Sequence, residues 1–209
     1  GLVWKEMPTP QPGQGEVRIA IRAASLNFPD ILIVQGKYQF KPALPFVPGS
    51  EYAGVVEALG EGVTNLKVGD AVAAMGSTGG FATHALAPAK QVLKLPPGFA
   101  LEDAAAFALT YGTTHHALVD RAALKAGETV LVLGAAGGVG SSAIQVAKAV
   151  GAKVIAAAST DEKCAFCREL GADATINYAT QNVRDALKAL TDSKGPDVVY
   201  DPVGGDLAE

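Results

Sequence analysis

The sequence predicts an α/β protein in which a β-rich domain, residues 1–108, precedes a doubly wound parallel sheet, residues 109–209. The first part is rich in Gly, Pro and Val and has little helical periodicity, which favours short strands joined by turns. In the second part, apolar runs alternate with segments of helical periodicity, which is typical of βαβ units. Together the two patterns indicate a small barrel-like or sandwich-like β domain followed by an α/β domain.

The strands expected in the first domain are short and separated by Gly and Pro. Val17–Ala23 alternates apolar and polar residues, which is typical of a half-buried strand. The sequence Pro96-Pro97-Gly98 ends the region. The expected strands are Val17–Ala23, Tyr52–Leu59, Ala71–Ala74, Phe81–Leu86 and Gln91–Leu95.

In the second domain the expected helices follow the strands in regular order. Thr129–Leu133 is a continuous apolar run, as expected of a buried parallel strand. Gly151 and Gly171 stand where helix C-caps are expected. The further expected strands are Lys153–Ala157, Ala174–Asn177 and Asp197–Tyr200, and the expected helices are Leu101–Leu118, Val139–Val150, Asp161–Leu170 and Val183–Leu190.

The composition narrows the possible partners and compartment. The chain has 209 residues, 49% hydrophobic and 18% charged, with a formal net charge of −4. No basic cluster predicts a nucleic-acid or anionic-membrane partner, and no apolar run approaches the ~20 residues that a transmembrane helix needs. There are only two cysteines, Cys164 and Cys167. This usage predicts a reducing, cytoplasmic environment.

A glycine-rich turn between an expected strand and an expected helix carries the strongest chemical signal. It runs Gly134-Ala-Ala-Gly-Gly-Val-Gly140. Ala135, Gly137 and Gly140 occupy the three glycine places of the dinucleotide fingerprint, which brings a pyrophosphate to a helix N-terminus. A tight turn without a ligand is the alternative. The predicted cofactor-binding residues of this turn are Ala136, Gly137, Gly138, Val139 and Gly140.

The end of the second expected strand favours NADPH over NADH. An NAD site places an acidic side chain there, for the ribose hydroxyls. Here Ala158 and Ser159 follow the strand, and Lys163 comes shortly afterwards, where it is able to pair with a 2′-phosphate. Asp161 and Glu162 argue for NADH, but both fall in the first turn of the expected helix, where acids suit the helix dipole.

With these motifs in view, the chain resembles the zinc-independent quinone oxidoreductase branch of the medium-chain dehydrogenase/reductases, the branch that contains zeta-crystallin. The resemblance covers essentially the whole chain. It is specific at the level of the family and much less specific for the substrate. The segments that carry it are Ser25–Asp30, Gln35–Tyr38, Pro48–Val56, Val68–Asp70, Ala104–Ala106, Ala135–Gly140, Gly171–Asp173 and Ile176–Tyr178.

The resemblance implies a GroES-like catalytic domain, a Rossmann domain and a set of site residues. Asn27 and Asp30 match an Asn-x-x-Asp that lies beside the nicotinamide, and Tyr38 matches a tyrosine that donates a proton in related enoyl-thioester reductases. These three are the predicted catalytic residues. The further cofactor-binding residues are Thr113, Ser159, Lys163 and Tyr178. The full-length protein is expected to be a homodimer.

No metal is expected. Zinc-dependent relatives bind catalytic zinc through a thiolate and an imidazole. In this chain Asn27 stands in place of the cysteine and Ser50 in place of the histidine. The pair Cys164 and Cys167 has the spacing of a redox motif, but it falls inside a helix beyond the phosphate turn. We interpret it as two partly buried helix thiols.

These inferences predict an NADPH:quinone reductase-like enzyme. Without zinc, no Lewis acid polarises an ordinary alcohol or ketone, so a quinone or a similar conjugated carbonyl is the expected hydride acceptor. One alternative is a 2-enoyl-thioester or enone reductase. Another is a family member that binds NADPH without catalysis.

The resemblance also implies a longer protein. In the family's strand order of 3-2-1-4-5-6, a chain ending just after the fourth Rossmann strand lacks the last two strands. We therefore expect this chain to be a fragment, truncated after the fourth Rossmann strand.

Overall fold

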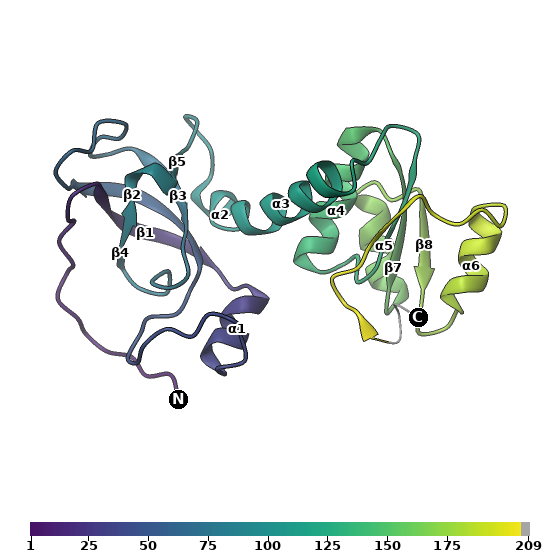
Figure 1. Cartoon of the computed structure of the whole chain (residues 1–209), viewed down its shortest axis with the longest axis horizontal. Coiled ribbons are helices and arrows are strands. Elements are labelled where there is room, and N and C mark those ends of the chain that lie inside the picture. Colours follow the sequence, from purple (N-terminus) through teal and green to yellow (C-terminus); the bar gives the residue numbers. More distant parts are fainter. Residues whose placement is uncertain (206–209) are drawn as a thin grey trace. The chain divides into compact units, whose positions relative to one another are not determined.

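The computed structural model describes residues 1–205, which form two compact units divided between Leu109 and Thr110. Figure 1 labels most of the helices and strands of both units. The α/β fold expected from the sequence is confirmed: the first unit is built on an antiparallel sheet and the second on a parallel sheet.

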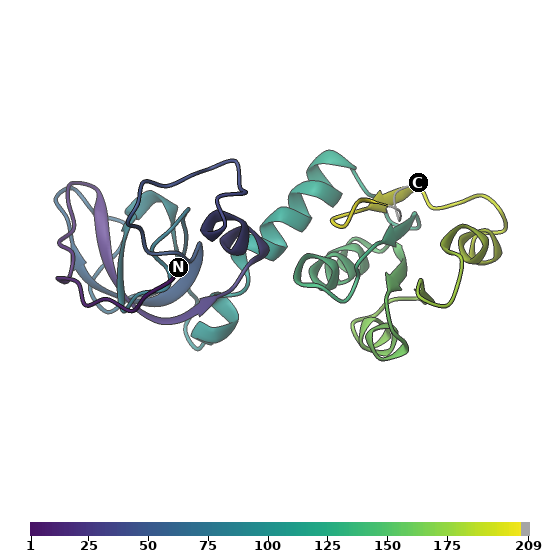
Figure 2. The same ribbon diagram turned by 90° about the horizontal axis from the view of Figure 1, so that it is seen from below.

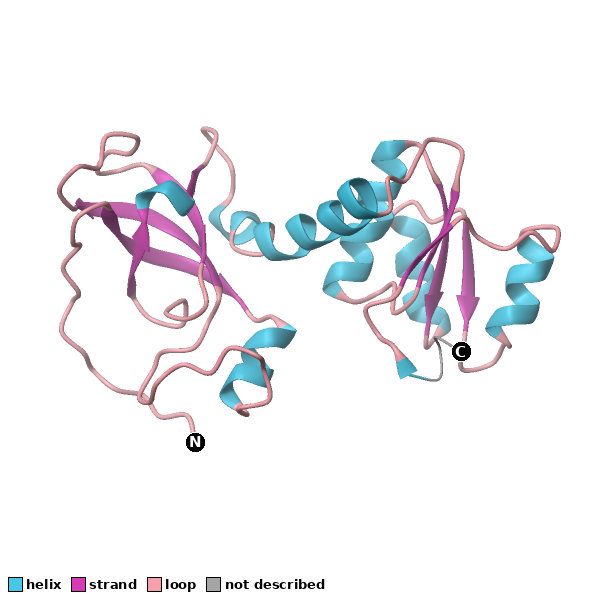
Figure 3. Ribbon diagram, in the orientation of Figure 1, coloured by secondary structure: helices cyan, strands magenta, loops and turns pink. Residues whose placement is uncertain are grey.

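The first unit has a five-stranded sheet in the order β4-β1-β2-β3-β5 (Figure 3). All four neighbouring pairs are antiparallel. Gly54 lies where β2 passes β1 most closely, and a Cβ atom there would collide with the carbonyl oxygen of Ala20. The strands are β1 (Glu16–Ser25), β2 (Glu51–Leu59), β3 (Ala71–Met75), β4 (His84–Pro88) and β5 (Val92–Lys94), and the 3-10 helix η1 covers Ala89–Gln91.

The sheet of the first unit buries residues on both of its faces. The larger cluster joins small and branched side chains from all five strands, among them Val17, Tyr52 and Val72. On the other face, Ala53 and Ala73 pack against Ala104 of the short helix α2 (Leu101–Ala104). Consecutive residues of one strand therefore enter different clusters, as the twofold periodicity of a strand requires.

A helix that the sequence analysis did not predict follows β1. Helix α1 (Phe28–Val34) has Asn27 at its N-cap, and the backbone N–H of Asn27 donates to the Asp30 carboxylate at 2.8 Å. Pro29 occupies the first turn, where proline is tolerated because its missing N–H is not needed there. The Asn-x-x-Asp motif is thus also a helix-start signal.

The second unit has a parallel four-stranded sheet in the order β8-β7-β6-β9. This is the 3-2-1-4 arrangement expected of the first four Rossmann strands. Gly151 ends α4 in the left-handed conformation, as expected. The elements are β6 (Thr129–Val132), α4 (Gly138–Val150), β7 (Lys153–Ala158), α5 (Asp161–Glu169), β8 (Ala174–Asn177), α6 (Val183–Leu190) and β9 (Val198–Tyr200).

Helices cover both faces of this parallel sheet (Figure 2). On one face, Val130 and Val154 of the strands pack with Ile144 of α4 and Cys167 of α5. On the other face, strand residues including Ile155 pack against the partly buried residues of α6. This layering explains why β6 and β7 are mostly apolar.

Two expected elements differ from the structure. The helix expected over Leu101–Leu118 is divided into α2, α3 (Ala108–His115) and the π-helix η2 (His116–Arg121). The strand expected from Phe81 begins only at His84, because the backbone N–H of Phe81 bonds to the carbonyl oxygen of Pro48 instead of to a strand. Within residues 1–205, no helix is long and apolar enough to cross a bilayer.

A prediction concerns the ion pair between Asp173 and Lys148. The lysine Nζ lies 2.9 Å from both carboxylate oxygens, and the N–H of Val154 donates to the same carboxylate at 2.7 Å. Burial raises the pKa of Asp173, but these hydrogen bonds outweigh that effect and lower the pKa below its ordinary value. Because the folded pKa is lowered, the stabilisation is present above the ordinary Asp pKa and is lost as the pH falls through the folded pKa.

We therefore expect Asp173→Asn to lower the free energy of unfolding at pH 7 by about 1 kcal/mol, a modest value because solvent screens the pair. The difference from wild type shrinks below about pH 4. Urea unfolding at pH 7 and pH 3 measures both quantities. Lys148→Met keeps the Val154 hydrogen bond and should lose less. An equal loss for Asp173→Asn at both pH values would contradict the assignment.

Candidate functional site

The glycine turn after β6 brings the start of α4 against the strand end. Gly134 has a φ of +58°, and Gly137 is the N-cap of α4. A Cβ atom added at Gly140 would lie 2.5 Å from the carbonyl oxygen of Gly134 and 2.7 Å from the Cα of Ala135. A glycine at position 140 is therefore required for this close packing of helix on turn.

The first residues of α4 offer their backbone to an anion. Gly137 and Gly138 are exposed, whereas Ala136 and Val139 are half-buried. The N-cap side chain of α5 accepts a hydrogen bond from its own helix, and so does that of α6, but the glycine N-cap of α4 has no side chain to do so. The first N–H groups of α4 therefore suit an external acceptor such as a phosphate.

Behind this turn lies a buried cluster of hydroxyl groups that sequence reasoning missed. The Thr114 hydroxyl lies 2.8 Å from the Ser142 hydroxyl and 3.4 Å from that of Tyr200. Thr114 and Ser142 also donate to the carbonyl oxygen of Val139, at 3.2 Å and 3.0 Å. Hydroxyl groups from α3, α4 and β9 thus stabilise the first turn of α4 on its buried side.

The predicted phosphate-pairing residues meet at the end of β7. The Lys163 Nζ donates to the Ser159 hydroxyl at 3.0 Å, because the two residues lie four apart across the start of α5. The backbone N–H of Tyr178 donates to the carbonyl oxygen of Ala158 at 3.0 Å, which places Tyr178 at the same strand end. Three of the four further cofactor-binding residues are therefore close together.

Asp161, one of the two acidic residues whose presence favours NADH, has a hydrogen-bond partner within the protein. Asp161, the first residue of α5, accepts a hydrogen bond of 2.7 Å from the Asn177 side-chain amide. Asn177 is buried at the end of β8. The carboxylate thus joins α5 to β8, a role that the sequence alone did not indicate.

Thr113 is exposed on α3, next to the buried Thr114. The two side chains point in different directions because neighbouring helix residues are rotated by about 100°. Thr114 faces α4, and Thr113 faces solvent.

The predicted catalytic pair Asn27 and Asp30 belongs to a hydrogen-bond network in the first unit. Asp30 is only 2% exposed, and its two oxygens accept from the Asn27 backbone N–H and from the Ser50 hydroxyl, both at 2.8 Å. The structure therefore brings Asn27, Asp30 and Ser50 together. Asp30 is buried, however, and both of its carboxylate oxygens accept hydrogen bonds from protein groups.

Glu51, beside Ser50 on β2, is a further member of this network. Its carboxylate accepts from the Ser25 hydroxyl at 2.7 Å, from Asn27 Nδ2 at 3.2 Å and from the Leu109 backbone N–H at 2.8 Å. Asn27 Nδ2 also donates to the Ser25 hydroxyl oxygen at 2.9 Å. The only sequence signal for this role was the motif Pro-Gly-x-Glu.

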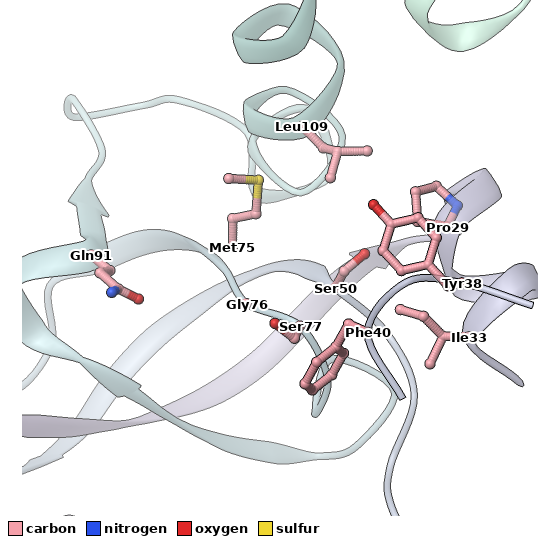
Figure 4. Close-up of a pocket in the computed structure, with 10 residues that line it drawn as sticks. All are labelled: Pro29, Ile33, Tyr38, Phe40, Ser50, Met75, Gly76, Ser77, Gln91 and Leu109. Carbon is pink, nitrogen blue, oxygen red and sulfur yellow. The ribbon is translucent and has the colours of Figure 1, made fainter. Parts of the chain in front are cut away.

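Tyr38 lines a cavity of about 350 Å³ in the first unit. Figure 4 shows its ring with the hydroxyl turned toward the space that Ser50 and Leu109 also line. Most of the lining is apolar, which suits a flat organic molecule with few polar groups. The full lining is Pro29, Ile33, Tyr38, Phe40, Ser50, Met75, Gly76, Ser77, Gln91 and Leu109.

Where zinc-dependent relatives have a cysteine and a histidine, this chain has Asn27 and Ser50. The Asn27 amide and the Ser50 hydroxyl both make hydrogen bonds within the network. Across residues 1–205, no group of three or more His, Cys, Asp or Glu is arranged to hold a metal ion. Cys164 and Cys167 are free and buried. Burial and the neighbouring Cys164 raise the pKa of Cys167, against the opposing effect of Arg168, which disfavours a reactive thiolate.

Comparison with known families assigns both halves of the chain. The family described as "Alcohol dehydrogenase GroES-like domain" matches residues 13–97. The family described as "Zinc-binding dehydrogenase" matches residues 138–209.

Two similar curated relatives have quinone oxidoreductase names. Quinone oxidoreductase-like protein 2 homolog of Nematostella vectensis is 43% identical over 208 residues, which cover 99% of this chain and 57% of the relative. Quinone oxidoreductase of Pseudomonas aeruginosa is 45% identical over 210 residues, which cover 100% of this chain and 64% of the relative. The chain thus spans 57% to 64% of the length of these two relatives.

Two solved structures are similar over nearly the whole of this chain. Escherichia coli quinone oxidoreductase complexed with NADPH is similar with a TM-score of 0.92 and 35% identity, over 98% of this chain and 63% of that one. CurK enoyl reductase is similar with a TM-score of 0.91 and 30% identity, over 99% of this chain and 64% of that one.

A prediction follows from the packing of Gly140. Gly140→Ala places a methyl group against backbone atoms of Gly134 and Ala135, so we expect it to lower the free energy of unfolding by about 1–3 kcal/mol. The matched control is Gly112→Ala in α3, where an added Cβ meets nothing within 4 Å. That control should stabilise the helix by about 0.5–1 kcal/mol. Urea unfolding measures both, and a neutral Gly140→Ala would refute the packing argument.

Proposed function

We propose a function from the following premise: the chain belongs to the medium-chain dehydrogenase/reductase superfamily. The proposal is that the protein is an NADPH-dependent oxidoreductase that reduces a small quinone or a similar conjugated carbonyl compound. The observation that carries it is the uncapped start of α4 packed on the glycine turn after β6. The names of the quinone oxidoreductase relatives and the NADPH in the similar E. coli structure support it.

The residues of the second unit fit a dinucleotide. Gly137 and Gly138 expose backbone at the N-terminus of α4, and side chains there would fill the space that a pyrophosphate needs. We assign the pyrophosphate to residues 136–140. Thr113 is exposed on α3, where its hydroxyl is available to a ligand. We accordingly assign residues 109–209 as the NADPH-binding domain and residues 1–108 as the catalytic domain.

The end of β7 fits a 2′-phosphate better than a bare ribose. Lys163 supplies a positive charge and Ser159 a hydroxyl within hydrogen-bond distance of each other, and Tyr178 lies at the same strand end. Asp161 is held by Asn177 instead of being available to accept from ribose hydroxyls. Charge-assisted contacts to a phosphate oxygen are stronger than neutral ones, so this set favours NADPH.

We assign to the first unit the binding of the substrate that accepts the hydride. Bound NADPH supplies the hydride, and the apolar cavity beside Tyr38 holds a flat acceptor away from water. The Tyr38 hydroxyl donates a hydrogen bond to the acceptor oxygen as negative charge develops there, and it or a water delivers the proton. Asp30 is a positioning residue, because both of its oxygens are used to hold Asn27 and Ser50.

Independence from zinc is part of the proposal. An amide and a hydroxyl, Asn27 and Ser50, replace the thiolate and imidazole that a catalytic zinc requires. Both groups are engaged in hydrogen bonds within a buried network, so they serve the packing of β1, α1 and β2. A quinone accepts hydride without a Lewis acid because its reduced anion is delocalised. The free thiols Cys164 and Cys167 support a reducing, cytoplasmic location.

A second candidate function is the reduction of enones or 2-enoyl thioesters. The presence of Tyr38 at the cavity favours it, since a conjugated carbon needs a proton after hydride addition. The similarity to CurK enoyl reductase supports it as well. A panel of quinones, enones and enoyl thioesters, each with NADPH, distinguishes the two candidates. Tight NADPH binding without turnover of any panel member would favour a non-catalytic role.

A prediction tests the choice of cofactor. Lys163→Ala removes the charge assigned to the 2′-phosphate, so affinity for NADPH should fall by roughly tenfold to a hundredfold, the loss of one charge-assisted hydrogen bond. Affinity for NADH should stay within about twofold, because NADH lacks that phosphate. Fluorescence titration with both cofactors measures this. Lys153→Ala, at the opposite end of β7, is the matched control. Equal losses for both cofactors would contradict the assignment.

Another prediction tests Tyr38. Tyr38→Phe keeps the ring in the cavity and removes the hydroxyl. We expect turnover of enones to fall by about 10²-fold or more, since general-acid assistance is worth that much. Quinones should be affected less, because the oxygen anion formed takes its proton from water. Steady-state rates with both acceptors measure the contrast. Unchanged rates with both acceptors would remove Tyr38 from the mechanism.

A further inference from the structure

The most deeply buried ionisable side chain of the candidate site is Glu51, which is 0% exposed. A buried carboxylate is costly unless donors satisfy its oxygens. Glu51 Oε2 accepts from the Ser25 hydroxyl and from Asn27 Nδ2, and Oε1 accepts from the Leu109 N–H. The three donors come from β1, from the cap of α1 and from the first turn of α3. This acid therefore holds three separate segments of the first unit together.

The network fixes which way the Asn27 amide faces. One amide nitrogen donates to two acceptors, Ser25 Oγ at 2.9 Å and Glu51 Oε2 at 3.2 Å. Rotating the amide by 180° would put its oxygen against Glu51 Oε2, which is already the acceptor for the Ser25 hydroxyl. Asn27 is the N-cap residue of α1, where the N–H of Asp30 bonds to its backbone carbonyl oxygen at 3.0 Å. The contacts of the amide nitrogen with Ser25 and Glu51 therefore select one orientation.

From this accounting we propose that Glu51 is a positioning residue, which holds the Asn27 nitrogen inward so that Asn27 meets a ligand only as a hydrogen-bond acceptor. Asn27 is then unable to polarise a carbonyl oxygen. Its remaining acceptor capacity suits a ligand hydroxyl or N–H group. Ser50 is similarly committed, because its proton goes to Asp30 at 2.8 Å. Of Asn27, Ser50 and Tyr38, only Tyr38 keeps a donor for the oxygen of the hydride acceptor.

The orientation of Asn27 is tested by a spectroscopic measurement that does not depend on activity. The side-chain NH₂ resonances of Asn27, identified by their loss in Asn27→Ala, report hydrogen exchange with solvent by NMR. We expect them to be protected in the wild type. Glu51→Gln replaces one acceptor oxygen by an NH₂ group, so exchange should accelerate by about tenfold or more, as one charge-assisted hydrogen bond is lost. An unchanged rate would overturn the proposal.

Matched variants separate positioning from general loss of structure. Glu57→Gln lies on the same strand and is partly exposed, so the Asn27 exchange rate should not change. If Glu51→Gln does not fold, Ser25→Ala takes its place, since it removes the other acceptor of Asn27 Nδ2 and leaves Glu51. Protection of the Asn27 NH₂ group should survive in Ser25→Ala, because Glu51 still accepts from it, and full loss of protection would overturn the proposal.

The statement about the ligand rests on the proposed function and has its own measurement. With NADPH as the probe, fluorescence titration should show about tenfold weaker binding by Glu51→Gln than by Glu57→Gln, because the released amide presents a donor where an acceptor is needed. If the wild type does not bind NADPH, the proposed function is wrong, and the hydrogen-exchange result alone decides whether Glu51 positions Asn27. Normal binding by Glu51→Gln, despite faster exchange, would overturn the ligand part.

Discussion

The close approach of α4 to the turn after β6 is the contact on which the candidate cofactor site depends. Gly140 lies against the backbone of Gly134 and Ala135, at distances that leave no room for a side chain. This contact sets where the helix begins, and the buried hydroxyls of Thr114 and Ser142 hold its first turn from the other side. A helix fixed in this way presents its first N–H groups at a defined place, which is the condition for binding a phosphate without rearrangement.

Much of the second unit could be predicted because its signals are local. Continuous apolar runs indicate buried parallel strands, and glycine caps mark the helix ends, so β6 begins at the expected Thr129 and α4 ends at the expected Val150. The contact between Ser159 and Lys163 is also local, since the two residues lie four apart at the start of α5. The glycine turn predicted the start of α4 to within one residue for the same reason.

The first unit was harder to predict because its polar network joins residues that are distant in sequence. Glu51 contacts Ser25, 26 residues away, and Leu109, 58 residues away, and no periodicity indicates such pairs. Helix α1 was missed because Asn27 and Asp30 were interpreted only as site residues, although the same spacing starts a helix. Likewise, the cluster of Thr114 and Tyr200 spans 86 residues.

The two units thus differ in how their polar groups are used. In the first unit the donors of Asn27 and Ser50 are directed to buried carboxylates, and the cavity has a mostly apolar lining that includes the Tyr38 hydroxyl. In the second unit the N-terminal groups of α4 receive no side-chain cap and suit an anion. A mostly apolar cavity selects the acceptor by shape and electrophilicity, whereas uncapped amides and Lys163 select the cofactor by charge. Substrate choice is therefore expected to tolerate change more readily than cofactor choice.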